Sequence, residues 1–364
     1  MNNPLLYSAM VKQSSLDAIG RRSLYAWGEN SSGQIGDGTT IDKSSPVQVG
    51  SSNWSSVACG FYHSLAIRED GKLFAWGFNF YGELGDGTTQ TRLSPVQVGT
   101  SSWKSVSCGS RHSLAVRDDG KLFAWGKNDF GQLGDGTTTN RLSPVQVGTS
   151  SWGTVSGGDL HSLGIRDDGK LFSWGINSDG QLGDGTTGGR ISPAQVGTDS
   201  WSSVSAGGIF SLAVRDDGKL FSWGDNTVGQ LGDGTTTNRL SPVQVGTSSW
   251  KAVGAGSLHS LAIRSDGRLF AWGYNNYGRL GDGTETYRLS PVQINAGNWS
   301  AVSGAYDHSL AIREDGKLFA WGGNQYGQLG DGTSENRSVP TQIGTGTWAA
   351  VDGMFLHSIG LLIA

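Results

Sequence analysis

Six histidines, each followed by a serine, are the residues that most suggest catalysis. A serine beside a histidine can act as a nucleophile with its general base. However, neighbouring residues on a strand point to opposite faces, and six copies of one pair cannot form a single active site. We therefore expect each histidine to bridge backbone groups by hydrogen bonds, and we expect no enzymatic activity. The histidines recur at His63, His112, His161, His259, His308 and His357, with Phe210 in the remaining place.

A second motif, Gly-Asp-Gly-Thr, offers one carboxylate per copy. A calcium loop needs several oxygen ligands at alternate positions, and a phosphate loop needs a following helix N-terminus. Neither pattern is present, so we expect turn-stabilising aspartates and predict no metal or cofactor. The motif recurs at Asp37, Asp86, Asp135, Asp184, Asp233, Asp282 and Asp331.

A series of arginines has the same period as these motifs. We expect them to pair with carboxylates of neighbouring repeats, and an anion-binding ring is the alternative. The series is Arg68, Arg117, Arg166, Arg215, Arg264 and Arg313.

Charge and cysteine content exclude several classes of protein. The formal net charge is −4 and no cluster of basic residues occurs, which argues against a nucleic-acid partner. The two cysteines, Cys59 and Cys108, are one period apart and are expected to be free, buried thiols. Lys12 interrupts the apolar stretch near the start, so no signal peptide is predicted. The sequence contains no long apolar run, so no membrane insertion is predicted.

The elements that carry these residues follow from one period of 49 residues. All 14 tryptophans fall into two series with this step, one starting at Trp27 and the other at Trp54. Periods of about 40–50 residues indicate propellers, solenoids or arrays. Residues 22–364 hold seven whole repeats. Residues 1–21 remain as a mildly apolar N-terminal extension, which we interpret as a tether or docking segment.

Each repeat reads as four short strands. In one copy these are residues 103–108, 112–117, 121–125 and 145–147, which we call strands A to D. Asp119-Gly120 predicts a type I′ turn between B and C, and Pro144 before strand D suits an edge. Seven such units predict an all-β fold, a single seven-bladed β-propeller of four-stranded antiparallel blades. Residues 357–364 form a strand B without a C, and residues 23–27 a C without a B. Their pairing is expected to close the ring.

The repeats resemble those of the regulator of chromosome condensation family. The resemblance rests on Gly-x-x-His-Ser-Leu-Ala, Asp-Gly-Lys-Leu-Phe-Ala-Trp-Gly and Asn-x-x-Gly-Gln-Leu-Gly-Asp-Gly. It implies the propeller fold, whereas the family's functions include nucleotide exchange, ultraviolet perception and protein interaction. Photoreception would need exposed tryptophans, but both series are explained as core. Exchange activity would need an inserted wedge, but every repeat has the same length.

The positions at which the repeats differ indicate a binding surface. The A–B turns and the starts of the C–D loops vary and are expected on one face. We predict a non-enzymatic scaffold that binds protein partners through this aromatic-rich face and residues 1–21. The alternatives are a glycan-binding or adhesive module, such as a bacteriophage virion surface protein, and an exchange-factor-like regulator. The candidate binding residues are Phe61, Tyr62, Phe78, Phe80, Tyr81, Arg111, Phe130, Tyr274, Tyr277, Tyr306 and Tyr326.

Overall fold

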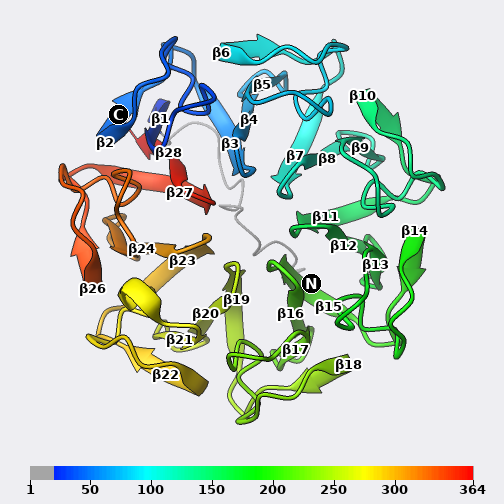
Figure 1. Ribbon diagram of the computed structural model, residues 1–364, viewed down its shortest axis with the longest axis vertical. Helices are drawn as coiled ribbons and strands as arrows, with labels where there is room; N and C mark the ends of the chain where they lie inside the picture. Colours follow the sequence, from blue (N-terminus) through cyan, green and yellow to red (C-terminus); the bar gives the residue numbers. More distant parts are fainter. Residues whose placement is uncertain (1–19, 364) are drawn as a thin grey trace.

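The computed structural model describes residues 20–363, and the fold is the seven-bladed propeller that the repeats predict (Figure 1). Seven four-stranded antiparallel sheets surround a central axis, and one short 3₁₀ helix, η1 (Asn276–Gly278), interrupts blade 5. None of the helices in residues 20–363 has the length and apolar character needed to cross a membrane. The prediction for residues 1–19 lies outside the described residues.

We number the blades 1 to 7 by their inner strands. The inner (A) strands are β3 (Trp54–Cys59), β7 (Trp103–Cys108), β11 (Trp152–Gly157), β15 (Trp201–Ala206), β19 (Trp250–Ala255), β23 (Trp299–Gly304) and β27 (Thr347–Met354). The B strands are β4 (His63–Arg68), β8 (His112–Arg117), β12 (His161–Arg166), β16 (Phe210–Arg215), β20 (His259–Arg264), β24 (His308–Arg313) and β28 (His357–Ile363).

The outer half of each blade follows the same order. The C strands are β5 (Leu73–Gly77), β9 (Leu122–Gly126), β13 (Leu171–Gly175), β17 (Leu220–Gly224), β21 (Leu269–Gly273), β25 (Leu318–Gly322) and β1 (Arg22–Gly28). The D strands are β6 (Arg92–Gln97), β10 (Arg141–Gln146), β14 (Arg190–Gln195), β18 (Arg239–Gln244), β22 (Arg288–Ile294), β26 (Arg337–Gln342) and β2 (Lys43–Gln48).

Blade 7 closes the ring as predicted. Its sheet has the order β2-β1-β28-β27, so two strands come from each end of the chain. Strands β1 and β28 pair in continuous register from Arg22↔Ile363 to Gly28↔His357. This pairing gives β1 and β28 a neighbour on each side and confirms the closure by terminal strands.

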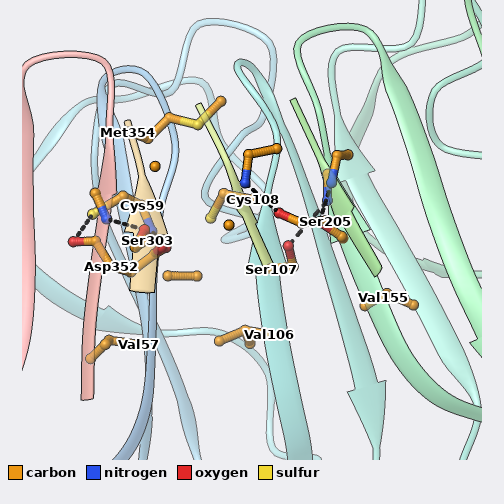
Figure 2. Close-up of a pocket in the computed structure, with 18 of the residues that line it drawn as sticks. Val57, Cys59, Val106, Ser107, Cys108, Val155, Ser205, Ser303, Asp352 and Met354 are labelled. Atoms are coloured by element: carbon orange, nitrogen blue, oxygen red, sulfur yellow. Dashed lines mark hydrogen bonds between the residues drawn. The ribbon is translucent and has the colours of Figure 1, made fainter. Parts of the chain in front are cut away.

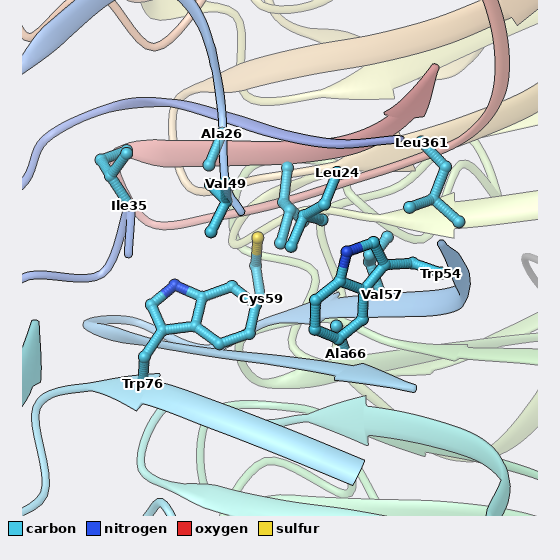
Figure 3. Packing of buried hydrophobic residues seen from close by; sticks show 11 residues of the cluster. Leu24, Ala26, Ile35, Val49, Trp54, Val57, Cys59, Ala66, Trp76 and Leu361 are labelled. Carbon is cyan, nitrogen blue, oxygen red and sulfur yellow. The ribbon is translucent and has the colours of Figure 1, made fainter. Parts of the chain in front are cut away.

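Both tryptophan series are core, as expected. Figure 3 shows the cluster between blades 7 and 1, in which Trp54 and Trp76 pack against Leu24, Cys59 and Leu361. Every tryptophan of the C strands is fully buried, and those of the A strands are at most 6% exposed. The Trp76 indole Nε1 donates to a backbone carbonyl of the preceding blade at 2.9 Å. The tryptophans therefore join neighbouring blades.

The turn between strands B and C differs from the predicted type I′. In blade 2 the Gly120 amide donates to Arg117 O, and the Arg117 amide donates to Lys121 O. Gly120 has a φ of 80°, whereas Asp119 keeps negative φ. This is a three-residue loop, a type I turn followed by a glycine in the left-handed region. Asp119 accepts the Lys121 amide through its side chain, which explains the aspartate without a positive φ.

The outer strand is longer than predicted. Strand D of blade 2 runs from Arg141 to Gln146, so Pro144 lies inside it. The prediction that proline precedes the strand was wrong. Pairing with β9 is irregular between Arg141 and Val145. The proline, which has no amide proton, is tolerated at this irregularity on an outer strand.

Candidate binding face

The A–B turns and the starts of the C–D loops lie together, as the strand directions predict. Backbone hydrogen bonds join them within each blade. The Phe78 amide donates to Tyr62 O at 2.8 Å, and the Lys127 amide donates to Arg111 O at 2.8 Å. We call the surface that these turns form the turn face.

Seven aromatic side chains on the turn face form one continuous chain of contacts. Phe61 stacks on Phe355 with 4.7 Å between ring centroids, and Tyr306 meets Phe355 edge-on at 5.1 Å. Contacts of 5.0–6.4 Å then continue outward along blade 1. Rings at these separations attract one another beyond the area that they bury. We call this chain the aromatic belt; it consists of Tyr306, Phe355, Phe61, Tyr62, Phe78, Phe80 and Tyr81.

Two basic side chains of blade 2 cover the outer end of the belt. The Arg111 guanidinium lies 5.8 Å from the Phe78 ring centroid and 5.5 Å from that of Tyr81. The Lys127 ammonium lies 5.0 Å from the Tyr81 centroid. These are cation–π distances. Phe80, which contacts both Phe78 and Tyr81, is 65% exposed, so the outer part of the belt presents an aromatic ring to solvent.

The remaining candidate residues lie apart from the belt. Tyr274 and Tyr277 belong to blade 5, where the Arg279 guanidinium lies 4.7 and 5.9 Å from their ring centroids. Phe130 and Tyr326 are exposed, and within residues 20–363 neither makes an aromatic pair. The structure thus brings together Phe61, Tyr62, Phe78, Phe80, Tyr81, Arg111 and Tyr306.

The sequence-based selection missed two residues of this region. Phe355 lies at the centre of the belt, and Glu83 lies beneath its outer end, fully buried. Phe355 occupies a variable position of the repeat, which is also phenylalanine at Phe61. Glu83 replaces the glutamine of the Gly-Gln-Leu-Gly motif in most other repeats, and this departure was the available signal.

The carboxyl group of Glu83 lies in an unusual electrostatic environment. Its Oε2 accepts the Tyr81 amide at 2.8 Å, whereas Oε1 is buried and has no hydrogen-bond partner among residues 20–363. Burial raises the pKa of this carboxyl to about 7, although Arg111 and Lys127 act in the opposite direction. Desolvation disfavours the charged form more than the two cations favour it.

The histidines bridge blades through serine hydroxyls rather than through backbone groups. His112 Nε2 lies 2.8 Å from Ser162 Oγ of the next blade, and this serine donates to Gln132 O at 2.8 Å. The expectation of direct backbone bonds was wrong. The histidine bonds instead to the serine of the histidine–serine pair in the next blade, and the hydroxyl of this serine is the acceptor. The described bridges are His63–Ser113, His112–Ser162, His161–Ser211, His259–Ser309, His308–Ser358 and His357–Ser64.

These imidazoles cannot serve substrate chemistry from where they lie. All six are at most 1% exposed. Burial lowers the pKa of His63, His112 and His357 to about 3. The bridges of these three histidines are therefore neutral hydrogen bonds inside the propeller wall.

The repeated acidic and basic residues form local ion pairs. Asp135 Oδ1 accepts both the Thr137 amide and hydroxyl, which confirms the turn-stabilising role, and its Oδ2 pairs with Arg141 at 2.7 Å. Arg117 pairs with Asp119 of its own turn at 2.6 Å and lies 4.8 Å from the centroid of Phe123. The prediction that this arginine series pairs with neighbouring blades was wrong. The partner carboxylate is two residues away.

A narrow channel follows the propeller axis, and its cavity volume is about 120 Å³. Figure 2 shows side chains of the inner strands that line it. Ser205 Oγ accepts the Ala255 amide of the next blade at 3.0 Å. In blade 7, Asp352 accepts Ser303 Oγ at 2.8 Å and the Cys59 amide at 2.9 Å. These bonds connect inner strands that do not pair as sheets.

Both cysteines of the inner strands are free and buried, as expected. Burial raises the pKa of the Cys59 and Cys108 thiols well above the usual value. Thiols in this state are poor nucleophiles.

Comparison with models of protein families agrees with the propeller fold described above. A family described as the RCC1-like domain matches residues 14–254, which is more than half of the chain. The chain belongs to the RCC1-like domain family. The regulator of chromosome condensation (RCC1) repeat also matches residues 266–312 and 315–350.

Solved structures of the same fold cover nearly all of this chain. Human WBSCR16 is 25% identical, with a TM-score of 0.87 over 94% of this chain and 99% of the other. Prp20p from Saccharomyces cerevisiae is 20% identical, with a TM-score of 0.87 over 100% and 96% of the two chains. Its structure was described together with binding to Gsp1p and histones. Yeast Prp20 has also been crystallised with Kap60, with a TM-score of 0.86 at 19% identity.

Proposed function

We propose that this RCC1-type propeller is a non-enzymatic scaffold that binds a protein partner through the turn face. The aromatic belt carries the proposal. Aromatic rings and arginine are the side chains that dominate protein interfaces. Here they form one connected group from blades 6, 7, 1 and 2, and Phe80 is exposed in its outer part.

The chemistry of the repeats supports binding rather than catalysis. The serine–histidine pairs are buried within the wall, and the thiols have raised pKa values. The related Prp20 is described with Gsp1p, histones and Kap60, all of them proteins. This comparison favours a protein partner over other ligands.

The proposal is tested by cross-linking capture from the natural source with paired variants. Phe80→Ser removes the exposed ring in the outer part of the belt. Ile41→Ser is the matched control, because Ile41 is 67% exposed but outside the belt. A partner held by the wild type and by Ile41→Ser, but lost with Phe80→Ser, supports the proposal. Equal capture by all three proteins would contradict it.

Glycan binding is the second candidate, because exposed aromatic rings also stack on sugar faces. An adhesive protein, including one on a virion surface, would use the belt in this way. The double variant Phe78→Ala, Tyr81→Ala separates the candidates. Glycan-array signals that disappear in this variant would favour the adhesive function, whereas an array without signals would count against it.

An exchange-factor-like regulator is the third candidate. Each blade keeps the same 49-residue length, so none contains an inserted segment that could act as a wedge. Under our proposal the protein leaves the rate of nucleotide release from a partner GTPase unchanged. Residues 1–21 are proposed as a second attachment point, tested by deleting them and measuring co-purification.

A further inference from the structure

Six blades stack an arginine from the end of strand B on the aromatic ring of strand C. The guanidinium carbon lies 4.5–5.3 Å from the ring centroid in these blades, which is a cation–π distance. Each arginine also pairs with the aspartate of its own B–C turn. The stacked pairs are Arg68–Phe74, Arg117–Phe123, Arg166–Phe172, Arg215–Phe221, Arg264–Phe270 and Arg313–Phe319.

Blade 7 keeps the aromatic ring but lacks the arginine. Leu362 is opposite Trp348 in the strand register of this blade. In blade 1, Arg68 is opposite Trp54 in the same way. Tyr25 takes the place of the phenylalanine, and its ring centroid lies 6.0 Å from that of Trp348. Strands β28 and β1 are not consecutive in the chain, so this blade has no B–C turn to supply an aspartate.

A pocket of about 430 Å³ lies at this place, in the seam between blades 6 and 7. In Figure 1 the seam is found between the outer strands β26 and β2. Pockets that hold small ligands measure about 300–1,000 Å³, so an arginine side chain has room here. Blade 7 contributes Tyr25, Pro46, Trp348 and Leu362 to the lining, and blade 6 contributes Asp331 and Gln342.

Leu362 fills only part of the space of the missing arginine. A Cβ at Gly346 would lie 2.4 Å from Leu362 Cδ1, so the leucine packs against the connection between blades 6 and 7. Its side chain is also shorter than that of arginine and has no planar group to lie on an aromatic face. Tyr25 remains partly exposed, and it lines the pocket.

The polar groups of the pocket suit a cation. Asp331 is the charged residue of the described lining, and its Oδ2 pairs with Arg337 at 2.7 Å. Gln342 Nε2 donates to Gly344 O at 2.9 Å, and within residues 20–363 its Oε1 accepts no hydrogen bond. None of the described residues that line the pocket is basic. A guanidinium suits this setting better than an ammonium, because it is planar, stacks on aromatic rings and is more weakly hydrated.

We infer that this pocket binds an arginine side chain of a partner protein, with the guanidinium stacked on Tyr25. The six other blades argue for this occupant, since each has an arginine at this place on the same kind of ring. In all six the guanidinium is carried by a polypeptide, which favours a protein over a free small molecule. The pocket lies at the end of β28 that is remote from the A–B turn. This second site is therefore separate from the aromatic belt and does not depend on the proposed function.

The test is saturation-transfer NMR of the full chain with acetyl-Gly-Arg-Gly-amide and with its citrulline twin, which has the shape of arginine without the charge. Wild type is expected to bind the arginine peptide at least fivefold more tightly than the twin. Leu362→Arg restores the arginine of the other blades and should weaken this binding at least tenfold, because the pocket is then filled. Ile41→Arg is the matched control, since it adds the same charge at an exposed position of blade 7. It should change the affinity by less than twofold.

Two variants of Tyr25 test the ring itself. Tyr25→Phe gives blade 7 the ring of the other blades and should keep the preference for the arginine peptide. Tyr25→Leu removes the aromatic face and should weaken binding of the arginine peptide to the level of its citrulline twin. Thermal melting of each variant verifies that the propeller is folded.

Three results would overturn the inference. One is equal binding of the two peptides by the wild type. Another is unchanged binding of the arginine peptide by Leu362→Arg or by Tyr25→Leu. The third is tighter binding of free L-arginine than of the peptide, which would assign the pocket to a small molecule. Capture of a partner through Phe80 is measured separately, so failure of one proposal is distinguishable from failure of the other.

Discussion

At the scale of single residues, departures from the repeat are more informative than the repeat itself. The residues that recur from repeat to repeat pack blades against each other, form turns or bridge the seams between blades. Glu83 and Met354 instead replace the residue found in most other repeats, and Phe355 occupies a variable position; all three lie at or beneath the turn face. Among the described residues, Glu83 Oε1 is buried without a hydrogen-bond partner, and Phe355 adopts a φ of 46°.

Glu83 makes folding stability depend on pH. Its pKa is about 7 in the folded protein, mainly through burial, against an ordinary 4.5. The folded state therefore binds a proton between these values, and its stability falls as pH rises from about 4.5 to 7. Glu83→Gln restores the residue of other repeats and is expected to stabilise the protein by ~1–3 kcal/mol at pH 8.

Urea unfolding at pH 4.5 and pH 8 measures this effect. The gain from Glu83→Gln should be smaller at pH 4.5, where the wild-type carboxyl is protonated in the fold. Glu285→Gln is the control, since Glu285 is exposed and should leave both values unchanged. A gain that is the same at both pH values would show that the charge is not the cause.

At the scale of elements, the seams between blades depend on the serine–histidine bridges. Blade 4 shows that a seam tolerates their loss, because Phe210 fills the histidine position and is fully buried. A bridge therefore adds stability to a seam that packing already holds.

His112→Phe copies this natural exception and tests the contribution of one bridge. The variant loses the 2.8 Å contact with Ser162, which is expected to cost about 0.5–1.5 kcal/mol at pH 7. The pKa of His112 is lowered to about 3 from 6.5. Its contribution is thus present above pH 6.5 and is lost as pH falls towards 3.

Denaturant unfolding at pH 7 and pH 4 measures both effects. The deficit of His112→Phe should shrink or reverse at pH 4, because the variant no longer has to keep this imidazole neutral. Lys104→Ala, at an exposed position of the same blade, should show no such change. An acid response equal to that of the wild type would refute this role for His112.

At the scale of the whole molecule, the 49-residue period was sufficient to predict the ring. It was not sufficient to predict which side chains meet at the seams between blades. The tryptophan spacing and the unpaired half-blades at the two ends were sufficient for seven blades and their closure. The partner of His112 was missed because Ser162 belongs to the next blade and comes close only in the folded ring. Phe355 was missed for the same reason, since its neighbours come from blades 1 and 6.

Closure itself is tested by a cross-link between the terminal strands. Ser23 and Leu362 are opposite each other in the β1–β28 pair. A disulfide in Ser23→Cys, Leu362→Cys closes a loop of nearly the whole chain and should raise the thermal midpoint by roughly 5 °C over its reduced form. The matched control Arg117→Cys, Lys121→Cys joins positions within one turn and should gain little. Identical melting of the oxidised and reduced closure variant would contradict this account of the ring.

The central claim is that the turn face binds a protein through the aromatic belt. The most direct measurement is the dissociation constant of the captured partner for wild type, Phe80→Ser and Ile41→Ser. The account predicts at least a tenfold weaker complex for Phe80→Ser and an unchanged one for Ile41→Ser. Unchanged binding by Phe80→Ser, or equal weakening by both variants, would contradict it.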